Sequence, residues 1–168
     1  MSHSQPELAY GRGFISVKLP ENAQATVIRK AELAKLPDNQ VAIREALENP
    51  VDAAPLSELA RNRKSACILI CDITRPVPNK LFLRPMIETM LAAGIPQSEI
   101  TVLVATGLHR PNLDEELEEL VGDPWVLENV RVENHYARNE DDLIDLGVTP
   151  TRGVPVKLNK RLVEADLR

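Results

Sequence analysis

The chain has 168 residues, of which 20 are basic and 25 acidic, so its net charge at pH 7 is −5. Such a length is typical of about one globular domain, and a net acidic chain argues against a dedicated surface for nucleic acid or anionic membranes. No apolar run approaches the roughly 20 residues that cross a bilayer, and residues 1–7 lack the order of a signal peptide. Cys67 and Cys71 share one apolar run, which argues against a disulfide scaffold and favours a reducing, cytoplasmic location.

The first 60 residues predict small β and α elements. Residues 14–19 and 25–28 have the composition of short strands. Residues 41–47 predict a short helix, and residues 55–61 predict another, because proline suits the first turn of a helix.

From residue 65 onward the pattern alternates between strands and helices. Buried strands are predicted at residues 66–71, 100–105 and 130–133, the first two being continuous apolar runs of the kind buried on both faces of a sheet. Helices are predicted between them at residues 81–93 and 113–121, ended by Gly94 and Gly122. This order predicts an α/β fold with a parallel-sheet core and alternating helices.

The last quarter of the chain is less regular. Residues 143–146 and 154–158 predict two more strands. Residues 162–167 run into the last residue without a stop signal, so we expect an incomplete domain that is truncated at its C-terminal end.

Polar residues follow each predicted strand of the sheet. In parallel sheets ligands bind beyond the carboxyl ends of the strands, so these residues are expected at one rim. The six candidates at this rim are Asp72, Thr74, Arg75, His109, Arg110 and His135.

The residues themselves favour a site for a small anion. Arg75 is a fixed cation that matches a carboxylate or phosphate, and His109 is the best candidate for a general acid and base. Asp72 would orient Arg75 or accept a hydrogen bond from a ligand hydroxyl. These residues also have structural interpretations, because an aspartate after a strand is commonly a turn residue. Cys67 and Cys71 are expected to be inert residues of the core. No zinc-type cysteine and histidine spacing and no glycine-rich phosphate loop is present.

Two motifs resemble a known family. The stretches Asp72-Ile73-Thr74-Arg75-Pro76-Val77-Pro78 and Ala105-Thr106-Gly107-Leu108-His109-Arg110-Pro111, followed by Asn134-His135, resemble the N-terminal region of the nickel-pincer lactate racemase family. Residues 162–168 resemble the segment just before the second catalytic histidine of that family.

The resemblance implies that residues 1–168 are the N-terminal domain of a two-domain, nickel-dependent racemase or epimerase of a lactate-like 2-hydroxy acid. It implies hydride transfer to a nickel-pincer nucleotide. His109 would be a catalytic acid and base, Arg75, Asp72 and Arg110 would bind substrate, and Asp72, Thr74 and Arg75 would bind the cofactor.

The resemblance also implies what this chain lacks. The family's second histidine, its cofactor-bearing lysine and its nickel-binding histidine follow the matched region, so no metal ligand is expected here. The 168-residue chain alone is therefore expected to be inactive and to bind no cofactor. Its partner would be the missing C-terminal domain or a complementary chain. Two alternatives stay open: a non-catalytic module that binds a carboxylate or phosphate, and a sugar-acid dehydratase of the same family.

Overall fold

The first unit of the chain carries a β-hairpin. The computed structural model describes residues 5–23 and 26–168, and the chain divides into two units, residues 1–35 and 36–168. In the first unit, β1 (Glu7–Tyr10) pairs antiparallel with β2 (Gly13–Ser16), which confirms the first part of the strand predicted at residues 14–19. Of the strand predicted at residues 25–28, Ala25 lies outside the described residues. The prediction is wrong for the other three, which form no regular element because no strand pairs with them.

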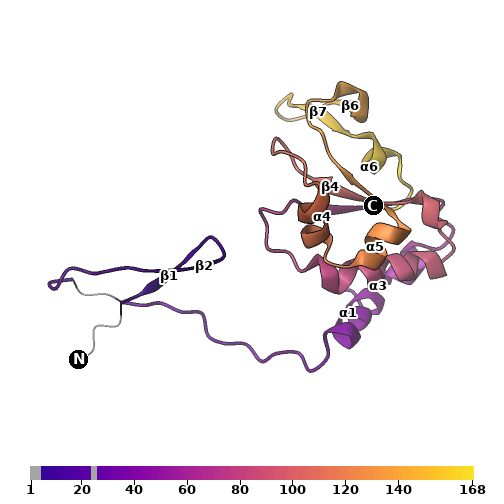
Figure 1. Cartoon of the computed structure of the whole chain (residues 1–168). Helices are drawn as coiled ribbons and strands as arrows, with labels where there is room; N and C mark the ends of the chain where they lie inside the picture. Colours follow the sequence, from indigo (N-terminus) through magenta and orange to yellow (C-terminus); the bar gives the residue numbers. More distant parts are fainter. Residues whose placement is uncertain (1–4, 24–25) are drawn as a thin grey trace. The chain divides into compact units, whose positions relative to one another are not determined.

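The second unit is built on a three-stranded parallel sheet. Its strands are β3 (Ala66–Cys71), β4 (Ile100–Ala105) and β5 (Arg131–Asn134), in the order β3-β4-β5 (Figure 1). In this register Ile68 lies opposite Val102, and Val102 opposite Val132. The predicted parallel α/β core is confirmed.

Helices cover one face of this sheet. Between the strands lie α3 (Asn79–Ala92), the short 3-10 helix η1 (Gln97–Glu99), α4 (Asp114–Val121) and α5 (Pro124–Asn129), and ahead of them α1 (Asn39–Glu48) and α2 (Leu56–Leu59). Leu83 and Ile87 of α3 are fully buried against the apolar side chains of β3 and β4. The sequence did not predict α5, whose start is marked by the Asp123 carboxylate accepting a hydrogen bond from the backbone N–H of Trp125.

The opposite face of the sheet is only partly covered. Cys67 and Leu103 pack there against Ala165, next to α6 (Lys160–Glu164). Leu69 is 50% exposed and Cys71 is exposed as well. The predictions that residues 66–71 are buried on both faces and that both cysteines lie in the core are therefore wrong for these two residues. Alternate side chains of a strand point to opposite faces, and one face has no cover at this point.

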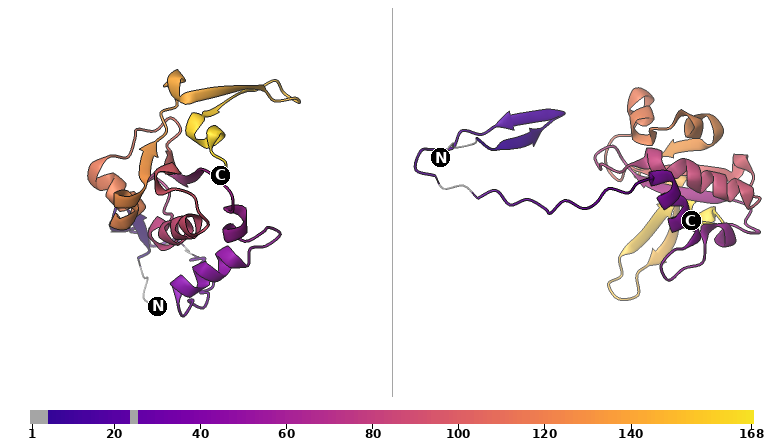
Figure 2. Two further views of the ribbon diagram at one scale, coloured as in Figure 1. Left: turned by 90° about the vertical axis from the view of Figure 1, so that its right-hand side faces the viewer. Right: turned by 90° about the horizontal axis from the view of Figure 1, so that it is seen from below.

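A second hairpin precedes α6. After the short η2 (Glu140–Asp142), β6 (Leu143–Val148) and β7 (Pro155–Asn159) pair antiparallel, which confirms both predicted strands. Figure 2 shows this hairpin projecting from the body of residues 36–168. The Asn159 side chain accepts a hydrogen bond from the backbone N–H of Arg161 and so marks the start of α6. Among the described residues, no helix has both the length and the apolar character needed to span a membrane.

Candidate functional site

The loop after β3 buries the side chain of Asp72 and exposes that of Arg75. Asp72 is only 5% exposed, and its Oδ1 accepts hydrogen bonds from the backbone N–H of Thr74, at 3.2 Å, and from the Thr74 hydroxyl, at 2.6 Å. The backbone N–H of Arg75 donates to the carbonyl of Asp72 at 3.1 Å and closes the turn. Aspartate forms such local bonds readily, which is why the loop has a fixed shape. The Arg75 side chain is left exposed.

The loop after β4 presents a histidine on a tight turn. The backbone N–H of His109 donates to the carbonyl of Thr106 at 3.0 Å, and Gly107 within this turn has a φ of 58° that glycine adopts without strain. The Thr106 hydroxyl donates to the carbonyl of His135 at 2.5 Å. This bond ties the turn to the end of β5.

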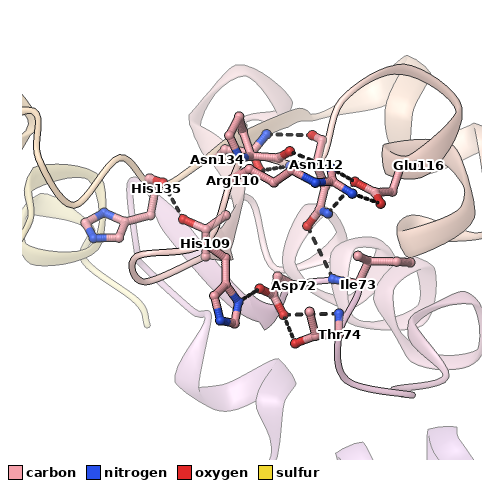
Figure 3. A network of polar contacts seen from close by, with 11 residues as sticks. Asp72, Ile73, Thr74, His109, Arg110, Asn112, Glu116, Asn134 and His135 are labelled. Atoms are coloured by element: carbon pink, nitrogen blue, oxygen red, sulfur yellow. Dashed lines mark hydrogen bonds and ion pairs between the residues drawn. The ribbon is translucent and has the colours of Figure 1, made fainter.

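The two loops meet through a carboxylate–imidazole pair. The Asp72 Oδ2 lies 2.5 Å from the His109 Nδ1, and Figure 3 shows Asp72 held between Thr74 and His109. The hydrogen bond from the Thr74 hydroxyl, followed by that from His109, holds the pKa of Asp72 below its ordinary value. An ionised carboxylate is an acceptor only, so the proton of a neutral imidazole lies on Nδ1 and Nε2 keeps a free lone pair.

The same residues line one open hollow. It has a volume of about 360 Å³, and Asp72, Thr74, Arg75 and His109 all contribute to its wall. The His109 side chain is 59% exposed. Within the described parts of the chain the Arg75 guanidinium forms no ion pair or hydrogen bond, so it is available to an anion in the hollow. The structure thus brings four of the six predicted rim residues together.

The other two predicted residues lie elsewhere. Arg110 makes a two-pronged ion pair with Glu116, at 2.6 and 2.8 Å, and is not among the residues that line the hollow. This pairing and a hydrogen bond from Asn112 lower the pKa of Glu116 to about 2. In Figure 3 the imidazole of His135 points away from Asp72 and His109. It contacts the Asn159 amide at 3.2 Å, and His135 is not among the residues that line the hollow.

A pair of buried asparagines was missed as a structural support for the site. The backbone N–H of Asn112 donates to the Asn134 side chain at 2.9 Å, and the Asn134 amide donates back to the Asn112 carbonyl at 2.8 Å. The Asn112 Oδ1 also accepts from the backbone N–H of Ile73 at 3.3 Å. All three rim loops are therefore joined. The sequence signal was present, because Asn112 lies in the polar segment that follows β4 and Asn134 is the polar last residue of β5.

Known proteins match this chain over nearly its whole length. Residues 10–168 match the family described as the lactate racemase N-terminal domain. The lactate racemase of Thermoanaerobacterium thermosaccharolyticum is 31% identical over 163 residues, and that of Lactiplantibacillus plantarum is 30% identical. Each match covers 96% of this chain and 38% of the relative, so the chain spans well under half the length of these enzymes.

Solved structures agree with the sequence matches. The lactate racemase apoprotein from T. thermosaccharolyticum superposes with a TM-score of 0.78 at 29% identity, over 97% of this chain and 37% of that protein. A Thermotoga maritima protein superposes with a TM-score of 0.56 at 22% identity, which supports the fold alone. Because the family match covers all of the second unit and most of the first, the chain belongs to the lactate racemase N-terminal domain family.

Proposed function

We propose that this chain is the N-terminal part of a lactate-racemase-like isomerase that inverts a 2-hydroxy acid. The observation that carries the proposal is the hollow in which Arg75, free of ion pairs among the described residues, lies on the same wall as an imidazole oriented by Asp72. The 30% and 31% identities to two lactate racemases support it. The substrate class follows from the relatives' names and from the anion that the hollow would accept.

Arg75 would hold the substrate carboxylate. A guanidinium offers two parallel N–H donors that match the two oxygens of a carboxylate. The surrounding loop is fixed by the hydrogen bonds of Asp72, so little conformational freedom is lost when an acid binds. Lysine at this position would keep the charge and lose the matched pair of bonds.

His109 would take and return the proton of the substrate hydroxyl. Its Nδ1–H is engaged by the Asp72 carboxylate, so Nε2 is the nitrogen left to act as acceptor. After the proton moves, the imidazolium remains next to a buried anion, which stabilises the charge that has formed. Asp72 is thus a positioning residue for His109, in addition to the substrate and cofactor contacts that the resemblance implies for it.

The residues fit part of the family's cofactor and do not fit its metal. The described residues contain no cluster of three or more histidine, cysteine, aspartate or glutamate side chains that could ligate nickel. Arg75 and the Thr74 hydroxyl would suit an anionic group of a nucleotide. When bound, the nickel-pincer nucleotide of this family would accept and return the hydride of the substrate carbon.

A chimera would test the proposal. Residues 1–168 would replace the matched region of the T. thermosaccharolyticum lactate racemase, and interconversion of D- and L-lactate would be measured. His109→Ala should lower kcat by about 10²–10⁴-fold with a much smaller change in KM, since general acid–base catalysis contributes about that factor. Arg75→Lys should raise KM as well, because the paired bonds to the carboxylate are lost.

Two arginine variants complete the comparison. Arg152→Lys, on the exposed tip of the β6–β7 hairpin, is the matched control and should leave both constants unchanged. Arg110→Lys tests the substrate contact implied by the resemblance, and the Glu116 ion pair predicts a KM like that of the parent chimera. Full activity of the His109→Ala chimera would contradict the proposal. Lactate binding through Arg75 without turnover would favour the non-catalytic binding module.

The two free cysteines indicate the kind of cellular compartment in which the chain resides. Cys67 and Cys71 form no disulfide and Cys71 is exposed. Exposed free thiols are typical of reducing compartments, so we also propose a cytoplasmic location.

A further inference from the structure

We propose that the free edge of β3 accepts one more parallel β-strand, supplied by the part of a longer lactate racemase chain that lies beyond the matched 38%. In the three-stranded sheet β3 pairs with β4 on one side only. The proposal fixes the direction of the added strand and its register. It does not depend on the proposed reaction.

The first step of this pairing is already present. Leu167 forms an isolated parallel bridge with Ala66. The backbone N–H of Cys67 donates to the Leu167 carbonyl at 2.9 Å, and the N–H of Leu167 donates to the carbonyl of Ser65 at 3.1 Å. These two bonds are the repeating unit of a parallel ladder.

The remaining backbone groups on the free edge of β3 are placed to continue the same ladder with an added strand. Along a strand, alternate residues direct both their N–H and C=O groups to the same edge. Because Ser65 and Cys67 face the free edge, Leu69 and Cys71 face it too, whereas Ile68 and Ile70 face β4. A strand continuing from Leu167 would therefore bond the Cys67 carbonyl, both groups of Leu69 and the N–H of Cys71.

Side-chain burial supports the same register. Leu167 packs against the main core, on the face that holds Ala66, Ile68 and Ile70. Residues two and four positions after Leu167 would extend that apolar row. Residues three and five positions after it would lie beside Leu69 and Cys71 on the opposite face. Leu69 is 50% exposed there, although parallel strands are normally buried on both faces.

Contacts at the beginning of the β3 edge disfavour pairing of this edge with a second copy of the chain. The Asp166 carboxylate accepts a hydrogen bond from the backbone N–H of Lys64 at 2.8 Å, and the backbone N–H of Asp166 donates to the Ser65 hydroxyl at 3.1 Å. With Leu167 these contacts already occupy the first residues of the edge. A symmetric pair of β3 edges would be antiparallel and would have to displace them.

The proposed strand also has a consequence for the site. Parallel to β3, about five residues reach from the level of Ala66 to that of Cys71, at about 3.3 Å per residue. The strand would end at the carboxyl edge of the sheet, next to the Asp72–Arg75 turn. Its following residues would be delivered to the open hollow that holds His109.

Amide hydrogen exchange tests the pairing directly. The ten residues that follow the matched region of the T. thermosaccharolyticum lactate racemase would be appended to Arg168. Exchange of the Leu69 and Cys71 amides should slow by at least about tenfold, because hydrogen-bonded amides exchange only through opening. Two proline variants of the extension provide the comparison. Prolines as the first and third appended residues remove the two N–H groups that bond β3, whereas a proline as the second removes one that faces away.

The amide exchange experiment has three informative outcomes. Slowed exchange in the extended chain and in the second-residue variant, and its loss in the first-and-third variant, would support the register. Unchanged exchange, or equal slowing in both proline variants, would overturn it. Slowing in the unextended chain that grows with protein concentration would show instead that a second copy occupies the edge.

Discussion

Replacing Asp72 with asparagine should reverse the tautomer of His109. The Thr74 hydroxyl and backbone N–H both donate to the Asp72 Oδ1, so the amide oxygen of an asparagine would take that position. Its NH₂ group would then occupy the place of Oδ2, 2.5 Å from the His109 Nδ1. An NH₂ group is a donor only, so Nδ1 must become the acceptor and the proton must move to Nε2.

The size of the effect follows from the bond that is lost. A hydrogen bond to a charged group contributes about 1.5–3 kcal/mol, and each 1.4 kcal/mol is a factor of ten, so the tautomer ratio should shift by about tenfold to a hundredfold. Nitrogen NMR of the histidine rings at alkaline pH distinguishes protonated from unprotonated Nδ1. The chain has three histidines, and His109→Ala identifies the signal.

Thr74→Val separates the tautomer effect from a general loosening of the loop. Alone it removes the hydroxyl donor and leaves an ionised Asp72 facing His109, so Nδ1 should stay protonated. Combined with Asp72→Asn, it weakens the anchor that orients the amide, and a mixture of tautomers is expected. A protonated Nδ1 in the Asp72→Asn variant, or an unprotonated one in the parent chain, would refute the assigned orientation.

Three further predictions concern acid stability, backbone conformation and thiol access. The pKa of Glu116 is lowered from 4.5 to about 2, so its pairing with Arg110 should stabilise the fold fully above pH 4.5 and progressively less toward pH 2. In urea unfolding, the stability of Glu116→Gln should therefore depend less on pH over this range than that of the parent chain. Gly122→Ala should lower the free energy of unfolding by more than the roughly 1–2 kcal/mol that a left-handed backbone costs a residue with a Cβ, because the new Cβ would lie 2.9 Å from the Cβ of Lys80. Gly153→Ala meets open space, so in the same unfolding assay it should show only that backbone cost. A thiol reagent should modify Cys71 rapidly, whereas Cys67 should react only on unfolding, because burial raises the pKa of its thiol to about 11. Rapid modification of both cysteines would contradict the assignment of Cys71 to the exposed face and Cys67 to the covered one.

Features of the fold that depend on local sequence were predictable. The apolar runs of β3 and β4 and the helical spacing of α3 are each contained in fewer than twenty residues, and the left-handed conformation at Gly122 ends α4 where a glycine was expected. The meeting of the Asp72 and His109 loops was predictable too. Parallel strands place their carboxyl ends at one edge, so topology alone brings the two loops together.

Features that depend on a distant partner were not predictable. Arg110 and Arg75 both follow strands, but only Arg110 has Glu116 within reach, on a helix whose acidic face has the composition of an ordinary solvated surface. The exposure of Leu69 and Cys71 has the same origin. An apolar run predicts a buried strand, yet burial also requires an element on the other side, and the position of α6 is set by tertiary packing.

The exposure of the site indicates what this domain supplies to the proposed reaction. Asp72 is buried and both of its carboxylate oxygens are hydrogen-bonded, so the orientation of the imidazole is set before any ligand arrives. His109 and Arg75 lie in an open hollow where water screens both groups. Closing such a site expels water and strengthens each electrostatic contact within it. The described residues therefore provide orientation without exclusion of water.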